Sequence, residues 1–489
     1  MNAKEFLKLC VSSTAFLAAP ALAQDEGEAP EVLDEAITVL DQTVPVADDP
    51  VESELPEMTA EDEETAARQE LSEAFLRFSE LRSEGVLDEA ENVAKRVIEL
   101  SIRLNGVNSI DTAKALNNLA VVQHQTGDFS AAALNFEQAI NIIRDVEDQL
   151  SNSLINPLKG LGAAQLASNR PDLAFGTYTR AMHVSHVNDG PHNLSQVDIL
   201  EALAETNLRL GEVEEARNLQ DIIYSLHLRY YEDDEIQMVP PLMRLARWQH
   251  RTGYLLDERA TYRRVIRIIE HVHDDNDIAL IEPLTLLGQS YYYADQSQSA
   301  YVTTTAASGE MYFKRAVRIA EDNPDSTWEL MARTKLSLGD YYTYRSDLGR
   351  ARKAYRDVWA LLSADEERLD LRREELEGVN ILLEDPLPRY IGGATVNDTA
   401  IGEGLREGRI LVSYNVSSRG RVTGLQVIEA TPVEFVDMQR LVTREVRDRI
   451  FRPRFEDGEP VESPGQSFSH EYFYLQEALD ELRAEADGS

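Results

Sequence analysis

The sequence has 489 residues, enough for two or more domains, and its 87 acidic and 48 basic residues give a formal net charge of −39. Such an acidic chain repels nucleic acid and anionic lipid headgroups, so we expect no nucleic-acid partner. The only cysteine, Cys10, excludes an internal disulfide framework, and the fold must therefore depend on its hydrophobic core.

The N-terminal segment 1–23 has the pattern of a secretory signal peptide. Lys4 and Lys8 precede an apolar run over 9–22, and Ala21-Leu22-Ala23 provides a cleavage site with small residues at both ends. The alternative is a retained membrane anchor, although this run is shorter than the ~20 residues that span a bilayer. We expect cleavage before Gln24 and a periplasmic location in a Gram-negative envelope, with a membrane attachment only if the segment is retained.

Two acidic segments flank the remaining chain. Residues 24–66 contain many acids, few aromatic side chains and no Lys or Arg. Such a composition buries too little apolar surface to fold alone, so we expect a disordered linker. The same reasoning applies to an acidic tail over 476–489.

Between 67 and 365 the sequence repeats with a period of 42 residues. Each copy has a small residue that follows a leucine or lies close to one, and a turn residue comes seven positions later. The small residues are Ala120, Gly162, Ala204, Ala246 and Gly288, and the turn residues are Gly127, Asn169, Gly211, Gly253 and Asp295. One copy lies upstream, and another lies downstream after a nine-residue insertion within 296–309.

This period predicts pairs of amphipathic helices that stack into a solenoid, because one hairpin cannot bury its apolar face alone. The pattern resembles the tetratricopeptide repeat in the 42-residue form of kinesin light chains. The segment 108–120, with Asn117-Asn118-Leu119-Ala120, resembles that form most closely. The resemblance implies an α solenoid of about seven hairpins whose concave surface binds a client protein.

The repeat register predicts which side chains face this groove. They are Asn117, His124, Lys159, Arg247, His250 and Tyr292. Lys159 and Arg247 are basic positions in an acidic chain and could hold a carboxylate or an acidic peptide. The alternative is a solvated face without a ligand, and the sequence does not identify the client.

A charged segment over 366–384 predicts a helix that caps the solenoid, and Asp385-Pro386 ends it. A second domain then follows over 385–475. Alternating apolar residues predict strands at 410–416, 422–429 and 467–475, and helical spacing predicts a helix over 432–451. Turns are expected at 417–420 and 457–458, which gives a small α+β domain with the order β-β-α-β.

This second domain resembles the C-terminal domain of TonB proteins. The resemblance depends on Gly408, Val412-x-Tyr414-x-Val416 with Gly420-Arg421-Val422, Val427 with Pro432, Phe451-Arg452-Pro453-Arg454-Phe455, and Asp457-Gly458-Glu459-Pro460-Val461. Where the family carries Tyr-Pro before the first strand, this chain has Tyr390-Ile391.

The resemblance implies that the last strand is an edge strand that takes up an extended segment of an outer-membrane TonB-dependent receptor, or a similar envelope protein, by β-augmentation. The residues expected to bind this partner are Ser467, Phe468, Ser469, His470, Glu471, Tyr472, Phe473 and Tyr474.

The sequence contains no recognisable catalytic motif, so we expect no enzyme, cofactor or metal. The pairs His183/His186 and His271/His273 are interpreted as solvated or packed histidines of repeat helices. The expected function is a periplasmic adaptor. The alternatives are a membrane-anchored TonB-type energy transducer and a structural scaffold that forms a homodimer through its C-terminal domain.

Overall fold

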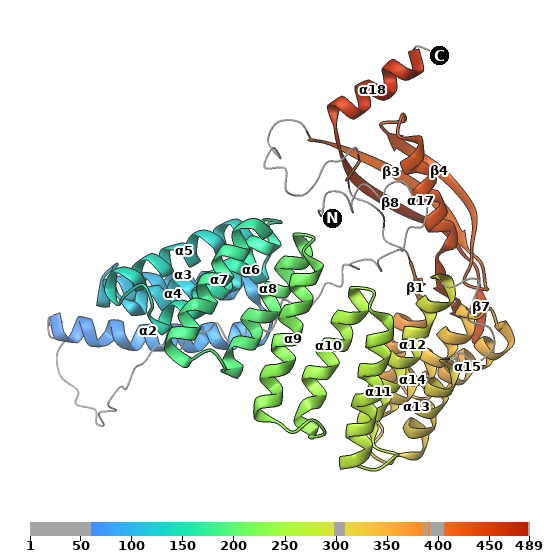
Figure 1. Cartoon of the computed structure of the whole chain (residues 1–489), viewed down its shortest axis with the longest axis horizontal. Helices are drawn as coiled ribbons and strands as arrows, with labels where there is room; N and C mark the ends of the chain where they lie inside the picture. The colour runs from blue at the N-terminus through green and yellow to red at the C-terminus, as the bar shows by residue number, and fades with distance from the viewer. Residues whose placement is uncertain (1–59, 298–308, 385–386, 388–389, 392–404, 488–489) are drawn as a thin grey trace, which may run out of the picture. The chain divides into compact units, whose positions relative to one another are not determined.

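The computed structural model describes residues 60–297, 309–384, 387, 390–391 and 405–487 (Figure 1). The expected signal peptide 1–23 lies outside the described residues, as does the expected linker up to residue 59. The described residues form two compact units, 60–230 and 231–487, which are considered separately below. No helix in the described ranges combines the length and apolar character that a membrane span needs.

The unit 60–230 consists of four helix hairpins, drawn in blue to green in Figure 1. Their helices are α2 (Ala60–Ser83), α3 (Leu87–Asn105), α4 (Ile110–Gln125), α5 (Phe129–Val146), α6 (Ile155–Ala167), α7 (Pro171–Asp189), α8 (Val197–Arg209) and α9 (Val213–Tyr230). Short 3₁₀ turns, η2 (Asn152–Leu154) and η3 (Leu194–Gln196), precede α6 and α8. Because α2 begins at Ala60, the last residues of the expected linker are helical.

The turns within these hairpins follow from their residues. Gly127 has φ 86° and Asn169 has φ 57°, a left-handed conformation that glycine and asparagine adopt most readily. Asp128 then caps α5, because its side chain accepts a hydrogen bond from the Ala131 amide at 3.0 Å. The predicted turns of this unit are therefore confirmed.

The predicted small residues are buried where helices cross. Ala120 and Ala204 have no exposed surface, and Gly162 is also buried. A Cβ atom added to Gly162 would lie 2.6 Å from Cζ of Tyr178 in α7, so the tyrosine ring occupies the space that a side chain would need. Close approach of the two helices in a hairpin thus requires glycine at this position.

The unit 231–487 begins with three more hairpins. Their helices are α10 (Val239–Arg251), α11 (Leu255–Val272), α12 (Ile281–Ser297), α13 (Glu310–Asp322), α14 (Trp328–Tyr344) and α15 (Leu348–Leu362), with the short turns η4 (Ile236–Met238) and η5 (Ile278–Leu280). The turn predicted at Asp295 is wrong, because α12 continues to Ser297 before the inserted segment. Seven hairpins in the described chain agree with the predicted solenoid.

The capping helix predicted over 366–384 is only partly correct. The chain forms η6 (Glu366–Arg368), α16 (Leu369–Arg372) and a π-helical turn, η7 (Arg373–Glu377), and then becomes the strand β1 (Asn380–Leu383). Strand β1 pairs in antiparallel fashion with β5 (Ile450–Arg452). Residues 380–383 are extended because their backbone groups bond to a strand about seventy residues later, which local helix propensity does not reveal.

The C-terminal domain contains a four-stranded sheet in the order β2-β8-β3-β4. The further elements are β2 (Tyr390–Ile391), β3 (Leu405–Val416), β4 (Val422–Thr431), α17 (Val436–Asp448), β6 (Arg454–Glu456), β7 (Glu459–Val461), β8 (Ser463–Leu475) and α18 (Gln476–Asp487). Strands β3, β4 and β8 with α17 follow the predicted β-β-α-β order. The expected helix over 432–451 is shorter, because Ile450 and Phe451 enter β5, and the start of the expected acidic tail is α18.

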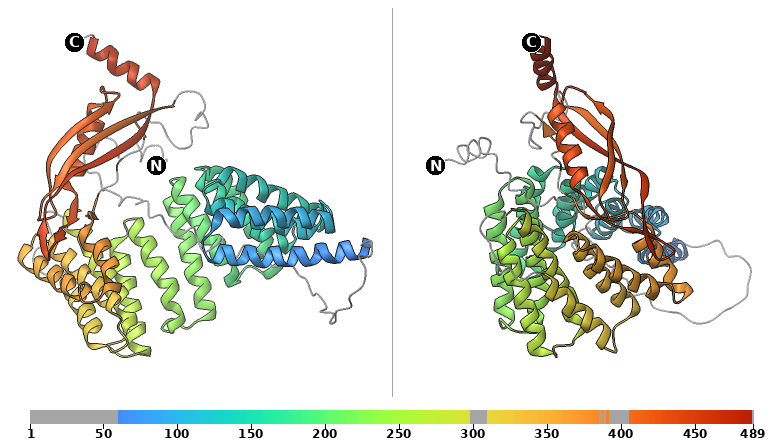
Figure 2. Two further views of the ribbon diagram at one scale, coloured as in Figure 1. Left: turned by 180° about the vertical axis from the view of Figure 1, so that it is seen from behind. Right: turned by 90° about the vertical axis from the view of Figure 1, so that its right-hand side faces the viewer.

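One face of the sheet packs on α17, as the two views in Figure 2 show. Apolar residues of α17, of β5 and of alternate positions on β3 and β8 form this core, including Val412, Val442, Val446, Phe451 and Tyr472, each completely buried. The opposite face is more polar, as expected for an antiparallel sheet with one solvated side.

The contact at Gly162 leads to a stability prediction. Gly162→Leu is expected to destabilise the chain by about 1 to 3 kcal/mol, because the new side chain must displace the Tyr178 ring. Gly176→Ala in α7 is the matched control, since a Cβ there meets nothing within 4 Å. It is expected to stabilise the chain by about 0.4 to 1 kcal/mol by reducing the entropy of the unfolded state. Denaturant unfolding measures both changes, and equal effects of the two substitutions would contradict the predicted packing.

Candidate functional site

The outer edge of β8 is the candidate binding site. On its inner side β8 pairs with β3 along most of its length, from Ser463 to Leu475. On its outer side the two-residue strand β2 pairs with it in parallel, opposite Phe473 and Tyr474. Over 463–472 the structure shows no strand of the described chain on this outer side. The predicted edge strand 467–475 differs in two ways from the strand in the structure, because β8 begins at Ser463 and β2 covers its end at Phe473 and Tyr474.

Side chains of β8 alternate between the two faces of the sheet. Ser467, Ser469 and Glu471 are exposed, and Arg409 of β3 donates a hydrogen bond from Nε to Oγ of Ser469 at 2.9 Å. His470 and Tyr472 are buried on the opposite face, which packs on α17. A strand added along this edge would therefore meet hydroxyl and carboxylate groups on one face and the rim of the apolar core on the other.

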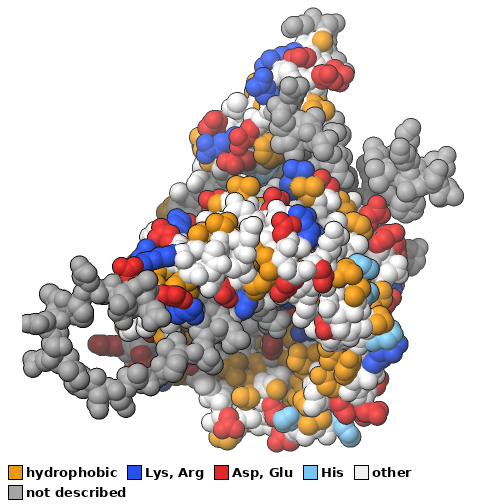
Figure 3. Space-filling view, turned by 90° about the vertical axis from the view of Figure 1, so that its left-hand side faces the viewer, with side chains coloured by type: hydrophobic (Ala, Val, Ile, Leu, Met, Phe, Trp, Pro, Cys, Tyr) orange, Lys and Arg blue, Asp and Glu red, His pale blue; other side chains and the backbone are white. Residues whose placement is uncertain are grey.

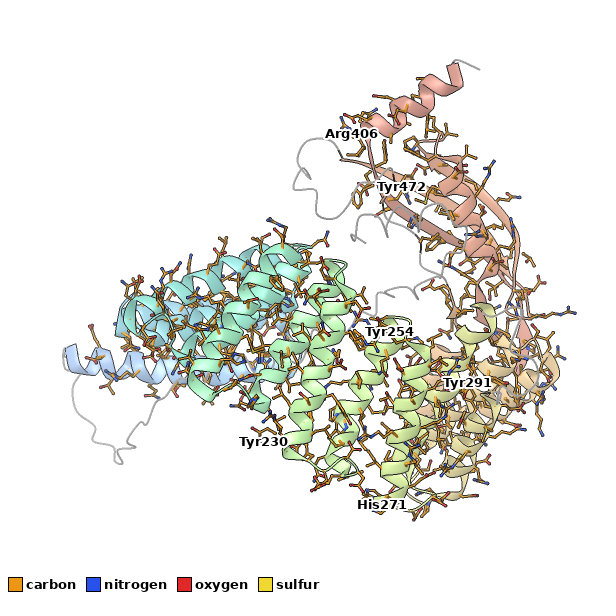
Figure 4. The ribbon with its side chains drawn as sticks, viewed as in Figure 1. Tyr230, Tyr254, His271, Tyr291, Arg406 and Tyr472 are labelled. Carbon is orange, nitrogen blue, oxygen red and sulfur yellow. The ribbon has the colours of Figure 1, made fainter. Side chains whose placement is uncertain are left out.

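Tyr472 is the central buried side chain of β8 and is labelled in Figure 4. Its ring lies against Phe435 at 6.0 Å between centroids, in an edge-to-face arrangement of 88°. On the neighbouring strand, a Cβ atom at Gly408 would lie 2.4 Å from the tyrosine ring, which accounts for the glycine. The Tyr472 hydroxyl is buried without a hydrogen-bond partner among the described residues, and burial raises its pKa to about 12.

This hydroxyl generates a prediction about pH. An unfolded tyrosine loses its proton near pH 10, so the raised pKa of folded Tyr472 makes a contribution to stability that is complete below pH 10 and is lost as the pH rises toward about 12. Tyr472→Phe is expected to remove this loss. At pH 7 it should leave the stability unchanged or raise it by up to about 1 kcal/mol, because an unsatisfied buried hydroxyl disappears. Urea unfolding at pH 8 and pH 11 measures how much free energy of unfolding the wild type and Tyr472→Phe each lose between these pH values. An equal loss in the two proteins would contradict the prediction.

Arg452 of β5 joins the C-terminal domain to the last helix hairpin through an ion pair with Asp340. Its Nη2 lies 2.7 Å from Oδ2 of Asp340 in α14, and Nη1 donates to the backbone oxygen of Glu375 in η7 at 3.0 Å. The Glu375 carboxylate, at 2.5 Å from Nη1, also accepts a hydrogen bond from Arg333 of α14 at 3.0 Å. Burial lowers the pKa of Arg452, but Asp340 outweighs this effect and raises it above its usual range. All three charged groups of the Arg452 cluster are largely shielded from solvent.

Aromatic side chains surround the Arg452 cluster. Phe455 of β6 packs on Tyr355 and Trp359 of α15, with centroid distances of 5.7 and 6.3 Å. The Tyr355 hydroxyl donates to Oδ1 of Asp340 at 2.9 Å, so it orients the carboxylate that holds Arg452. The turn Asp457-Gly458, with positive φ at both residues, brings the backbone next to the Trp359 ring. The segment from Phe451 to Phe455 therefore attaches the domain to the repeats.

Sequence reasoning missed this attachment. The segment Phe451–Phe455 has no local feature that indicates a partner in the repeats, and Asp340 follows the small residue of its repeat at a position that is Val121, Glu205 or Gln289 in other repeats. An acid at this position is not a signal by itself, because Glu205 occupies it in an earlier repeat, whereas Trp359 departs from the repeat pattern. Nothing in the sequence pairs these residues with Arg452.

Arg452→Met is expected to destabilise the unit 231–487 by about 3 to 5 kcal/mol, because it leaves Asp340 and Glu375 buried without a counter-charge. Arg454→Met is the control, since Arg454 is partly exposed and faces a largely exposed Glu456. Its effect should stay within about 0.5 kcal/mol. Thermal and denaturant unfolding compare the two, and an Arg452 variant as stable as the control would contradict the proposed attachment.

The expected groove residues occupy different environments. In the unit 60–230, Asn117, His124 and Lys159 are buried, and Lys159 pairs with Asp198 of α8 at 3.0 Å. These side chains contribute to helix packing and are not exposed to solvent, and their role in binding a client stays a prediction. Register identifies the side of a helix but not how deeply a neighbouring hairpin covers it.

In the unit 231–487, Tyr292 is also buried and stacks on Tyr344 at 4.5 Å. His250 lies 3.1 Å from the buried carboxylate of Glu258, which occupies a position that is alanine in other repeats. Arg247 is exposed, as expected, and pairs with Glu282 at 2.9 Å.

Charged side chains do not gather into one binding surface on the face drawn in Figure 3. On the face drawn in Figure 3, acidic and basic side chains are interspersed among hydrophobic ones. Within the described ranges, no cluster of three or more His, Asp or Glu side chains has a geometry suited to a metal ion. The candidate sites therefore have to be argued from local geometry.

Comparisons with known proteins agree with the helical repeats. Residues 81–145 match the tetratricopeptide repeat family. This match covers the end of α2 through α5, and the other hairpins repeat the same architecture with the 42-residue period. A comparison with curated proteins finds no match to the chain.

Solved structures include several similar helical-repeat proteins. The C-terminal part of a TPR repeat-containing protein from Cytophaga hutchinsonii is 12% identical, over 60% of this chain and 98% of that one, with a TM-score of 0.37. Nearly identical kinesin-light-chain-type TPR-like repeats from Podosopora anserina are 15% identical, over 45% and 99%, with a TM-score of 0.37. Aspartyl phosphate phosphatase F from Bacillus subtilis is 12% identical, over 62% and 73%, with a TM-score of 0.37.

A tetratricopeptide-like fold is suited to protein–protein interaction, because stacked hairpins present extended surfaces to other chains. The small C-terminal sheet adds a second kind of surface, the outer edge of β8, which no strand of the described residues covers over 463–472.

Proposed function

We propose that the chain is a protein-binding adaptor of the Gram-negative periplasm. The helical repeats bind one partner, and the outer edge of β8 takes up an extended segment of an outer-membrane TonB-dependent receptor by β-augmentation. The observation that carries this proposal is the edge over 463–472, which no described strand covers on its outer side. The periplasmic location depends on the signal peptide expected at 1–23.

The chain itself provides an example of the proposed binding mode. Strand β2 pairs in parallel with β8 opposite Phe473 and Tyr474, so the outer edge accepts an extended segment at its end. Main-chain hydrogen bonds would supply most of the affinity, and the exposed side chains of Ser467, Ser469 and Glu471 would help to select the register. The Arg452 cluster supports this role, because it attaches the C-terminal domain to α14 and η7 and so limits the movement of the β8 edge relative to the last repeat.

A structural scaffold is the second candidate, and β4 favours it. This strand lies at the opposite edge of the sheet, and its apolar residues Val427 and Ile428 are 41% and 58% exposed. Two copies that paired along β4 would bury these side chains and form the homodimer considered above. A membrane-anchored transducer would share the β8 site and differ in retaining residues 1–23.

Disulfide trapping distinguishes these possibilities. With Cys10 replaced by serine the chain has no other cysteine, so Ser469→Cys places one thiol beside the outer edge of β8. Gln426→Cys is the matched control on β4, because both residues are exposed and oppose β3 residues. Cross-strand Cβ atoms about 4.5 to 5.5 Å apart are close to the separation that a disulfide requires. The probes are synthetic peptides from receptor N-terminal segments, each with one cysteine.

The adaptor proposal predicts a peptide adduct with Ser469→Cys and not with Gln426→Cys, at alternate cysteine positions along the peptide. Alternation is expected because side chains of an added strand point to opposite faces. Adducts at equal rates with both variants, or with neither, would reject β8 as the receptor site. A disulfide-linked homodimer of Gln426→Cys alone would favour the scaffold.

A further inference from the structure

A cationic surface pocket lies between α5 and α7 in the unit 60–230. Its volume is about 440 Å³, and its lining residues are Arg144, Gln149, Leu150, Arg180, His183 and Val184. None of these six is acidic, although the chain as a whole has a net charge of −39. Arg180 forms no ion pair with any described residue, and Arg144 is approached only by its neighbour Asp145, at 3.7 Å and at an exposed position.

The walls of this pocket are fixed by the backbone. Asn188 of α7 donates to the carbonyl oxygens of Leu150 and Val184, each at 2.8 Å. The Asp148 side chain accepts a hydrogen bond from the Leu150 amide at 2.6 Å. The bond from Asn188 to Leu150 holds the loop after α5 against α7, and the bond from Leu150 to Asp148 orders the loop itself, so binding would require little further ordering of the loop.

In two later repeats the same position carries an arginine that pairs with an acid, whereas the repeat directly after α7 has Ile222 there. Arg264 lies two 42-residue repeats after Arg180, and it bonds to the backbone oxygen of Asp233 at 2.8 Å and to the Asp233 carboxylate. In the following repeat, Arg315 bonds to the Glu270 carboxylate at 2.5 Å and to the backbone of Asp275. At these two places, an arginine of the second helix is neutralised by a carboxylate of the preceding hairpin.

The hairpins of α5 and α7 keep the arginine but lack the carboxylate. Gln149 occupies the position of Asp233 and Asp275, and Arg144 occupies the position of Glu270. Arg180 therefore meets a neutral amide and a second arginine where its counterparts meet acids. Two guanidinium groups and an imidazole then surround a space that in later repeats contains a carboxylate.

We propose that this pocket binds a carboxylate supplied by a ligand, in place of the missing protein carboxylate. Arg180 and Arg144 would donate hydrogen bonds to its two oxygens, a geometry for which guanidinium groups are well suited. Leu150 and Val184 provide an apolar wall beside the charged groups. The fitting ligand is thus an organic acid with an apolar side chain, either free or at the C-terminus of a peptide.

The test uses the full chain and N-acetyl-leucine as the probe, with saturation-transfer NMR to detect binding. N-acetyl-leucine amide has the same side chain without the charge. The proposal predicts that N-acetyl-leucine binds the wild type saturably. The amide should bind the wild type about tenfold or more weakly, and N-acetyl-leucine should bind the Arg180→Gln variant about tenfold or more weakly. Arg170→Gln is the matched control, because it removes one exposed positive charge at the other end of α7. It should leave binding unchanged.

Gln149→Asp provides an independent test, because it restores the acid found in the later repeats. The new carboxylate should pair with Arg180, raise the melting temperature and abolish probe binding. Equal binding of acid and amide, equal effects of Arg180→Gln and Arg170→Gln, or undiminished binding by Gln149→Asp would each overturn the proposal. Displacement of the probe by inorganic phosphate at lower concentrations than by acetate would overturn the assignment to carboxylates.

Discussion

The ion cluster of Arg452 with Asp340 and Glu375 is the constraint on which the architecture of the unit 231–487 depends. It joins three segments distant in sequence, namely α14, η7 and β5. A buried ion pair contributes little net stability, because desolvation of the charges offsets most of their attraction. Opening the cluster is nevertheless costly, since it would leave charges buried without partners. The cluster therefore determines the position in which the domain contacts the repeats. The contact is stabilised mainly by the burial of Phe455 against Tyr355 and Trp359, because burial of such a side chain contributes about 1.5 to 3 kcal/mol.

This docking has consequences for the sheet. Strand β5 carries Arg452 and also pairs with β1, so the chain leaving the last repeat is held beside the domain. The C-terminal domain is thus attached to the repeats by side-chain and strand contacts as well as by the chain between them. These contacts limit the movement of the outer edge of β8 relative to the last repeat.

Much of the repeat architecture could be predicted because its determinants are local. Gly162 is needed where the Tyr178 ring crosses, and Gly127 is needed where the chain turns with positive φ, so each copy repeats the same residue types. Residues whose structure depends on distant partners were predicted less well. Asn380–Leu383 reads as the end of a charged helix but forms a strand, because β5 supplies its hydrogen bonds. Lys159 and Tyr292 have groove positions by register, but the depth of packing around them depends on neighbouring hairpins and places them in the interior.

Native-state hydrogen exchange of the full chain, followed by mass spectrometry at increasing denaturant, tests the docking most directly. If the Arg452 cluster unites the domain with the repeats, amides of β3 and β8 and amides of α14 and α15 will open in one cooperative step with a common free energy. If the amides of β3 and β8 instead exchange with a distinctly lower free energy while α14 and α15 remain protected, the sheet opens independently and the account is contradicted.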